Sequence, residues 1–269
     1  MKASEILNKI VKEKGTHEFI PTGFPGLDND LDGGFLRKEL VVIGGSTGAG
    51  KSYLAVHLAM KAIESGFKVG YFSLEISNEL VVARMMGMKA GVKASHILYG
   101  SVDESTQNYK KGKVFILGLG DLLESYDDIY ELDKIEGLIK ENKFDMVVID
   151  FIQNVITSRS DEYERLSHTS LHLQRIAKQT NSCIVVLSQL SNVVSARGVG
   201  DRPLEYKGSG SIATVADLGF FLSKGDPDLQ LSPNFEDYIL MLAKNRRGAS
   251  KIATKLQVAW GGGIINEKS

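Results

Sequence analysis

Eight consecutive residues carry the clearest chemical signal in the sequence. They match the pattern G-x-x-x-x-G-K-[ST] in full: Gly45, Ser46, Thr47, Gly48, Ala49, Gly50, Lys51 and Ser52. Glycines let successive backbone N–H groups curl around phosphate oxygens without side chains in the way. In such a loop the lysine reaches the β- and γ-phosphates, and the hydroxyl binds Mg²⁺. The motif therefore predicts a site for ATP and Mg²⁺.

Two acidic residues at the ends of apolar runs are candidates for the remaining chemistry. Asp150 ends the run MVVID, so its carboxylate is expected beside the loop as a second Mg²⁺ contact, since open α/β sheets bind ligands there. Glu75 ends the run KVGYFSLE and is the candidate base that orients and deprotonates water. The alternative for Glu75 is a capping or surface carboxylate. Glu79 is a rival base, but it falls within the next expected helix.

Alternating strands and helices must position these residues. Apolar runs predict buried strands over 39–45, 68–75, 112–118, 144–150 and 183–189. Between them, helical patterns cover 51–65, 78–90, 131–142 and 161–180. This alternation predicts an α/β fold with a mostly parallel twisted sheet and helices on both faces. The last strands, expected over 217–223, 237–245 and 250–260, have no helices between them and predict an antiparallel edge.

Length and composition bound the remaining possibilities. The chain has 269 residues, of which 43% are apolar, which suits one large α/β domain. The net charge is −1, so any nucleic-acid contact must come from a local patch. Cys183 is the single cysteine, which is typical of a reducing cytosolic compartment. We expect no signal peptide and no bilayer span, because no apolar run approaches about 20 residues.

The first residues predict a short amphipathic helix over 4–14, followed by a turn-rich stretch over 19–35. A helix this short is marginal alone in water. Its apolar stripe must therefore dock, either on its own domain or on a neighbouring subunit.

Six segments, taken in order, resemble the C-terminal ATPase domain of DnaB-type hexameric replicative helicases. They are PTGFPGLDNDLDGGFLRKELVVIGG, YFSLEISNELVVARMM, VVIDFIQNV, CIVVLSQLSNVVSARGVGDRP, YKGSGSIATVADLGFFL and AKNRRG. Together they cover roughly residues 19–260. The resemblance implies a RecA-like P-loop NTPase core over 19–269, preceded by a linker-like helix within 1–18.

The resemblance also assigns roles that the residues alone do not. It makes Glu75 the catalytic base, and it gives Gln189 a contact with the γ-phosphate that couples to the loop following it. Lys244 and Arg246 would reach into the nucleotide site of the next subunit as trans-acting cations. Composition alone favours a solvated hairpin turn for KNRRG, since Asn and Gly are turn formers.

Residues 191–210 are the expected DNA contact. The candidates are cationic or free their backbone N–H groups for phosphate: Arg197, Arg202, Lys207, Gly208, Ser209 and Gly210. The alternative is a mobile surface loop. The sequence departs from the family here, with Lys207-Gly208 where the helicases have Arg-Glu, and Thr47 stands where they often have Pro.

The leading hypothesis is an ATP-driven motor that translocates on single-stranded or forked DNA and unwinds duplex in replication. It implies a homo-oligomer, expected to be a six-fold ring, in the cytoplasm of a bacterium or of cells infected by a bacterial virus. It leaves open a primase or helicase loader as partner. The alternatives are a RecA-, RadA- or KaiC-like ATPase of filaments or regulation, and a non-enzymatic interaction module.

Replicative helicases carry an N-terminal domain, whereas only the expected helix over 4–14 precedes the ATPase segments here. Two interpretations stay open, a fragment of a longer protein and a stand-alone relative.

A histidine pair raises the question of a metal. His168 and His172 have i, i+4 spacing, but the run HTSLH lacks the glutamate of H-E-x-x-H. Both lie opposite the apolar stripe of the expected helix, so we expect a solvated helix face and no metal.

Overall fold

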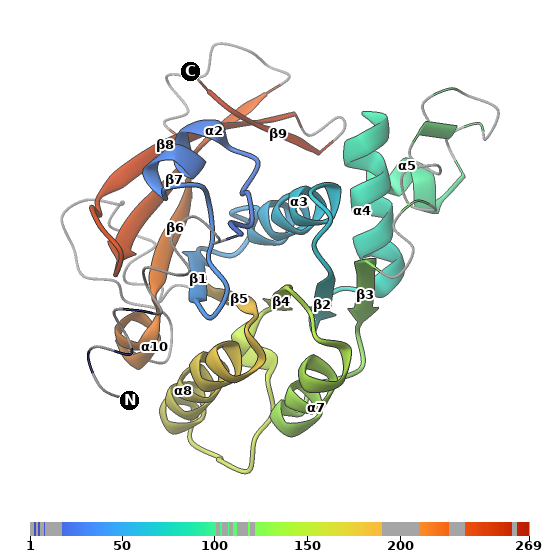
Figure 1. Ribbon diagram of the computed structural model, residues 1–269. Helices are drawn as coiled ribbons and strands as arrows, with labels where there is room; N and C mark the ends of the chain where they lie inside the picture. The colour runs from blue at the N-terminus through green and yellow to red at the C-terminus, as the bar shows by residue number, and fades with distance from the viewer. Residues whose placement is uncertain are drawn as a thin grey trace.

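The computed structural model describes residues 18–100, 122–189, 210–225, 235–259 and 263–268, with a few isolated positions besides. Apart from such isolated positions, the expected helix over 4–14 and the expected strand over 112–118 lie outside the described residues. Within them, one nine-stranded sheet has the order β3-β2-β4-β5-β1-β6-β7-β8-β9 (Figure 1). The strands are β1 (Leu40–Gly45), β2 (Val69–Ser73), β3 (Leu123–Tyr126), β4 (Met146–Asp150), β5 (Cys183–Gln189), β6 (Leu218–Lys224), β7 (Glu236–Asn245), β8 (Ile252–Ala259) and β9 (Ile264–Glu267).

The sheet has a parallel part and an antiparallel part. Every neighbouring pair from β3 to β6 is parallel, and the pairs from β6 to β9 are antiparallel. Both predictions for the sheet are therefore confirmed. The sequence did not indicate β3 or β9, because these four-residue edge strands are too short to show a hydrophobic period.

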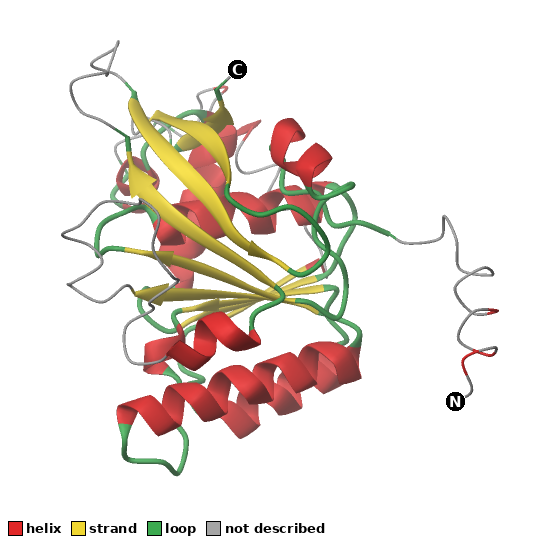
Figure 2. Cartoon of the chain, turned by 90° about the vertical axis from the view of Figure 1, so that its left-hand side faces the viewer, coloured by secondary structure: helices red, strands yellow, loops and turns green. Residues whose placement is uncertain are grey.

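Helices cover both faces of the sheet, as predicted (Figures 1 and 2). One apolar cluster joins the sheet to α2, α3 and α4, and a second joins the opposite face to α7, α8 and α10. The helices are α2 (Pro25–Asp30), α3 (Lys51–Glu64), α4 (Asn78–Ala90), α5 (Ala94–Leu98), α7 (Leu132–Asn142), α8 (Glu162–Thr180) and α10 (Gly210–Val215), with a 3-10 turn η2 (Ile152–Asn154). None of the described helices is long and apolar enough to cross a membrane.

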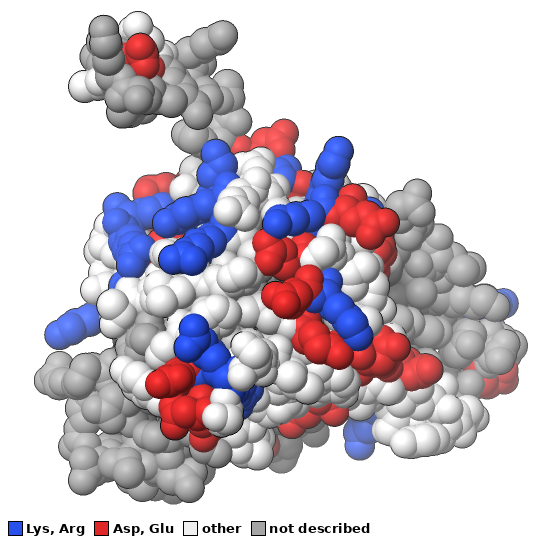
Figure 3. Space-filling model, turned by 90° about the horizontal axis from the view of Figure 1, so that it is seen from below, with Lys and Arg blue, Asp and Glu red and all other residues white. Residues whose placement is uncertain are grey.

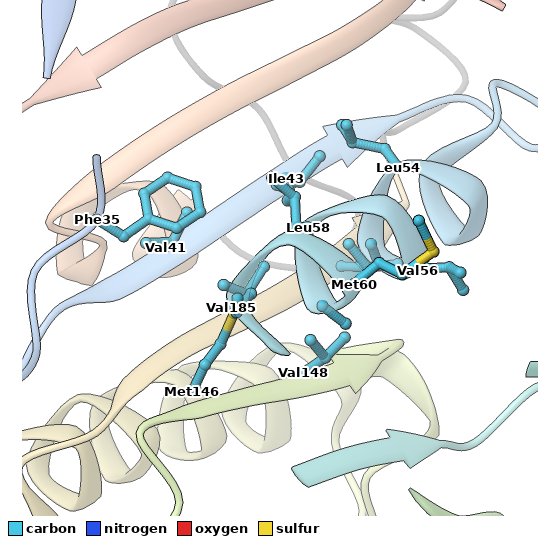
Figure 4. Packing of buried hydrophobic residues seen from close by; sticks show 14 of the residues in the cluster. Phe35, Val41, Ile43, Leu54, Val56, Leu58, Met60, Met146, Val148 and Val185 are labelled. Carbon is cyan, nitrogen blue, oxygen red and sulfur yellow. The ribbon is translucent and has the colours of Figure 1, made fainter. Parts of the chain in front are cut away.

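The core explains why the central strands stay fixed. Val41 and Ile43 of β1 face the cluster that contains α3, whereas Val42 between them faces the cluster of α8. Figure 4 shows Ile43 against Leu58 of α3. All residues of β1, β2 and β4 are buried. Each buried Val, Leu or Ile side chain contributes about 1.5–3 kcal/mol, so the strand ends that carry the site residues are held by packing on both faces.

Helix ends follow the local signals of the sequence. The Asp161 carboxylate accepts the Glu164 N–H at 2.8 Å, which caps α8, and the helix ends at Asn181 with a left-handed φ of 59°. The turn-rich stretch over 19–35 differs from expectation, because it contains the short helix α2. Pro25 begins that helix, and the Asp28 carboxylate accepts the Thr22 N–H at 2.8 Å.

A buried histidine joins this stretch to the helix that follows the glycine-rich loop. The His57 ring of α3 stacks on Phe24 with 4.5 Å between ring centroids, and its Nε2 is buried without a partner among the described residues. Burial, together with the charge of Lys61, lowers the pKa of His57 to about 4.

This environment predicts a loss of stability in mild acid. The unfolded chain binds a proton at His57 near pH 6.5, but the folded chain does so only near pH 4, so stability falls as pH drops from 6.5 toward 4. We expect this one group to cost about 2 kcal/mol at pH 5. Urea unfolding at pH 7.5 and 5.0 should show that His57→Leu reduces the pH dependence by this amount. The exposed His96 of α5 provides the control, and an equal effect of His96→Leu would contradict the account.

Candidate active site

The glycine-rich loop lies between β1 and α3, as the motif requires. Gly48 and Gly50 have left-handed φ values of 75° and 85°, which let the backbone curl back on itself. The Lys51 ammonium group donates hydrogen bonds to the carbonyl oxygens of Gly45 and Ser46, both at 2.9 Å. Burial lowers the pKa of Lys51, and the negative charge of Asp150 opposes this shift. The predicted phosphate loop and the predicted metal ligand therefore share one site.

Gly45 is required by space. A β-carbon at this position would lie 2.9 Å from the Leu222 carbonyl oxygen of β6 and 3.2 Å from Cγ of Lys51. Any side chain would thus press on the neighbouring strand and on the lysine together.

Asp150 occupies the carboxyl end of β4, as predicted. It is 1% exposed, and burial raises its pKa, while a hydrogen bond from the Ser52 hydroxyl lowers it. The Tyr71 hydroxyl donates a second hydrogen bond to its Oδ2 at 3.2 Å. A carboxylate and a hydroxyl oxygen in contact beside a phosphate-type loop are ligands that Mg²⁺ prefers, so the side chains fit this metal.

Glu75 lies beyond the end of its strand and not in it. β2 ends at Ser73, which is in register with Asp150, and the Leu74 N–H donates to the Asp150 carbonyl at 2.8 Å. The Asn154 side chain donates to the Leu74 carbonyl at 2.7 Å. Glu75 is exposed, and its charge acts on both Lys51 and Asp150. The rival Glu79 is exposed in the first turn of α4.

Gln189 is the last residue of β5 and is in register with Gly45. Gln153 of η2 connects this strand end with that of Asp150. Its amide donates to the Ser188 hydroxyl at 3.0 Å, and its Oε1 accepts the Gln189 N–H at 3.4 Å. The ends of β1, β2, β4 and β5 are thus joined into one edge that carries the candidate residues.

Sequence analysis missed several residues of this edge. Tyr71 donates a hydrogen bond to the Asp150 carboxylate, and the Gln153 side chain accepts the Gln189 N–H. Arg84 of α4 lies over the Tyr53 ring with 4.5 Å between Cζ and the ring centroid, and its charge favours the ionised form of Asp150. A cation in the middle of the apolar run LVVARMM was the available signal for Arg84.

Lys244 and Arg246 are not brought together with the loop. Lys244 is in register with Gly219 of β6, and the Arg246 N–H donates to the Asp217 carbonyl. In β6 it is Leu222, five residues after Asp217, that is in register with Gly45. Five residues of strand span about 16 Å. The two cations therefore lie at the amino ends of the parallel strands, on the opposite side of the sheet from the carboxyl ends that carry the loop.

Most of the expected DNA-contacting residues, Arg197, Arg202, Lys207, Gly208 and Ser209, lie outside the described residues. Gly210 begins α10.

The two histidines of α8 are half-buried, which corrects the expectation of a fully solvated face. α7 packs beside α8, and His172 pairs with Glu136 of α7 at 2.6 Å. Asp133 also places a carboxylate oxygen within 4.8 Å of these groups. Figure 3 shows this face, on which acidic side chains gather over α7 while a separate group of Lys and Arg lies over the α8 half. The Glu136 carboxylate of this cluster pairs with both His172 and Lys140.

The family model described as the DnaB-like helicase C terminal domain matches residues 19–260. The chain belongs to the DnaB-like helicase C-terminal domain family. The replicative DNA helicase DnaC of Bacillus subtilis is 29% identical over 257 residues, which is 90% of this chain and 55% of that protein. The replicative DNA helicase DnaB of Rickettsia bellii is 27% identical over 237 residues, which is 80% of this chain and 47% of that protein. The chain spans about half the length of the curated relatives it matches.

Solved structures support the same fold. One that is described as an ATPase domain has a TM-score of 0.87 and 21% identity, with 100% of this chain and 99% of that chain covered. A DnaB-like replicative helicase, described with its interactions with primase, has a TM-score of 0.85 and 22% identity, with 99% and 69% covered. A KaiC-like protein of Pyrococcus horikoshii has a TM-score of 0.66 and 15% identity, with 94% and 100% covered. The chain thus has the predicted RecA-like α/β fold.

The crowding at Gly45 predicts a matched pair of glycine variants. Gly45→Ala should lower the free energy of unfolding by about 1–3 kcal/mol, because its methyl group overpacks Leu222 and Lys51. Gly137→Ala on α7 meets nothing within 4 Å and should instead raise stability by up to about 1 kcal/mol. Denaturant unfolding of both variants checks the two signs. A stable Gly45→Ala protein would show that this position tolerates a side chain.

Proposed function

We propose that this chain is the ATPase motor of a DNA helicase, which hydrolyses ATP between subunits, translocates on single-stranded DNA and unwinds duplex. The observation that carries the proposal is the division of its candidate residues. The phosphate loop, Asp150 and Glu75 lie at the carboxyl ends of the parallel strands, whereas Lys244 and Arg246 lie at their amino ends. Such a site is completed only by a second copy of the chain.

Nucleotide binding follows from the loop. Backbone N–H groups of residues 45–52 cradle the phosphates, and the Lys51 ammonium exchanges its two carbonyl partners for phosphate oxygens. Ser52 and Asp150 would hold Mg²⁺, which neutralises charge on the β- and γ-phosphates. Burial opposes the ionised form of Asp150 that this role requires, whereas the hydrogen bonds from Ser52 and Tyr71 favour it.

Hydrolysis needs a group that takes a proton from the attacking water. Glu75 is exposed, close enough to act on Lys51 and Asp150, and fixed at its backbone by the neighbouring Leu74. Gln189, held through Gln153, would contact the γ-phosphate from the adjacent strand end. It also begins the connection to residues 191–210, the proposed DNA contact.

Lys244 and Arg246 would act in the site of the next subunit. Cations supplied in this way stabilise the transition state for phosphoryl transfer and are worth on the order of 10³–10⁵ in rate. An interface in which one surface donates and a different surface accepts is heterologous, and it generates a ring when the rotation closes and a helical filament when it does not. We therefore propose a homo-oligomeric ring, six-fold as in the hexameric class that the sequence resembles, with primase or a helicase loader as further partners.

Strand separation of a forked DNA duplex tests the proposed function. With ATP and Mg²⁺ the protein should separate the strands, and Lys51→Ala should abolish this. ATP turnover without strand separation would contradict a helicase and favour a RecA- or KaiC-like switch. The absence of both activities in the unaltered protein would contradict an ATP-driven motor.

The proposed base gives a second prediction. Glu75→Gln should lower ATP turnover by at least about 100-fold, because general-base catalysis contributes 10²–10⁴-fold, while nucleotide affinity stays nearly unchanged. Glu79→Gln is the matched control on the same stretch and should keep full turnover. Steady-state hydrolysis and fluorescent-nucleotide binding measure the two quantities. The reverse pattern would identify Glu79 as the base.

A further inference from the structure

Lys244 and Arg246, at the amino ends of the parallel strands, are held by a specific set of hydrogen-bond acceptors. The Lys244 ammonium donates to the carbonyl oxygens of Ala213 and Thr214, both at 2.7 Å. The Arg246 guanidinium donates to the Thr214 carbonyl at 2.9 Å and to Asp217 Oδ1 at 2.8 Å. The last turn of α10 and one carboxylate thus fix both side chains next to each other.

Asp217 is itself fixed from several directions. Its Oδ2 accepts the Leu40 N–H at 2.9 Å, and its backbone N–H donates to the Leu40 carbonyl at 2.8 Å. Its Oδ1 also accepts from the Gln174 side chain of α8 at 3.4 Å, and Gln174 donates to the Val215 carbonyl at 2.7 Å. The Asp217 side chain is 13% exposed, whereas that of Arg246 is 44% exposed. The fixed Asp217 carboxylate therefore anchors the more exposed side chain of Arg246.

Two like charges side by side need such a support. Burial lowers the pKa of Lys244, and the charge of Arg246 lowers it further, whereas Asp217 opposes this. Without the carboxylate, the two cations would repel each other and the guanidinium would lose its charged acceptor. A displacement of 1 Å is enough to cost about 100-fold in rate for a group that must meet a reacting centre.

We propose that Asp217 is a positioning residue that presents Arg246 and Lys244 to the nucleotide site of the next subunit. This inference rests on the proposed trans-acting role of the two cations. Asp217 touches no phosphate in this account. It acts on hydrolysis in the neighbouring subunit through the direction in which Arg246 points.

Asp217→Asn tests the proposal by its kinetics. The phosphate loop of the variant is intact, so the KM for ATP should stay within about twofold while kcat falls about tenfold or more. Asp237→Asn is a matched control, because Asp237 of β7 likewise accepts from a cation and a glutamine, Lys268 at 2.7 Å and Gln257 at 3.4 Å. The control should keep the full kcat. Equal losses in both variants would contradict a positioning role.

Mixed oligomers decide whether the effect acts in trans. Lys51→Ala subunits lack a working pocket but donate intact cations, whereas Asp217→Asn subunits have the reverse defect. When equal amounts are mixed before assembly, about a quarter of the heterologous interfaces combine the two intact halves. ATP turnover of the mixture should then exceed the mean of the separate proteins about fivefold, given the tenfold defect expected of the variant.

Arg246→Ala mixed with Lys51→Ala separates the two possible failures. If this mixture gains turnover but the Asp217→Asn mixture does not, the role of Asp217 is wrong and the trans role of Arg246 stands. If neither mixture gains turnover, the trans role is wrong, and the inference falls with it.

Gln174→Ala provides a second variant if Asp217→Asn does not fold. It loosens Asp217 and α10 without touching the Leu40 hydrogen bonds. Its own defect should be smaller, about threefold, so mixing with Lys51→Ala should raise turnover about twofold above the mean of the separate proteins. No gain from this variant, with the Arg246→Ala mixture active, would contradict the proposal.

Discussion

The parallel register of four buried strands is the constraint on which the rest of this structure depends. β1, β5, β4 and β2 run in the same direction, so the residues at their carboxyl ends meet at one edge. Both faces of these strands are packed by apolar side chains, and a shift of one residue would turn each of them to the wrong face. Packing therefore sets the relative position of Lys51, Asp150 and Gln189 before any ligand binds.

The same sheet separates the two halves of the proposed chemistry. β7 runs antiparallel to β6, so its last residues lie beside the amino end of β6, away from the phosphate loop. Lys244 and Arg246 are anchored there on α10 and Asp217, and they cannot approach the loop of their own chain without breaking those hydrogen bonds. The antiparallel pairing of β7 with β6 is thus the feature that makes a neighbouring copy part of the proposed active site.

Local patterns were sufficient for most of the fold and for one side of the site. The runs ending at Gly45 and Asp150 are apolar throughout, so their burial, direction and terminal residues could be predicted together. Contacts made across the sheet could not. Tyr71 reads as one more apolar strand residue, but its hydroxyl supports Asp150, and Gln153 supports Gln189 from a different segment. Arg246 is anchored by Asp217 and by α10, and Gln174 of α8 in turn holds Asp217. These contacts join segments that are far apart in the sequence, so no short segment could predict them.

The dependence of ATP turnover on assembly tests whether the active site is shared between subunits. ATP hydrolysis per chain should be measured over a dilution series, with the molecular mass determined at each concentration. Turnover per chain should fall as oligomers dissociate, and monomers should be inactive, since their pockets lack the cations of a neighbour. Monomers with the full turnover per chain would contradict a shared site.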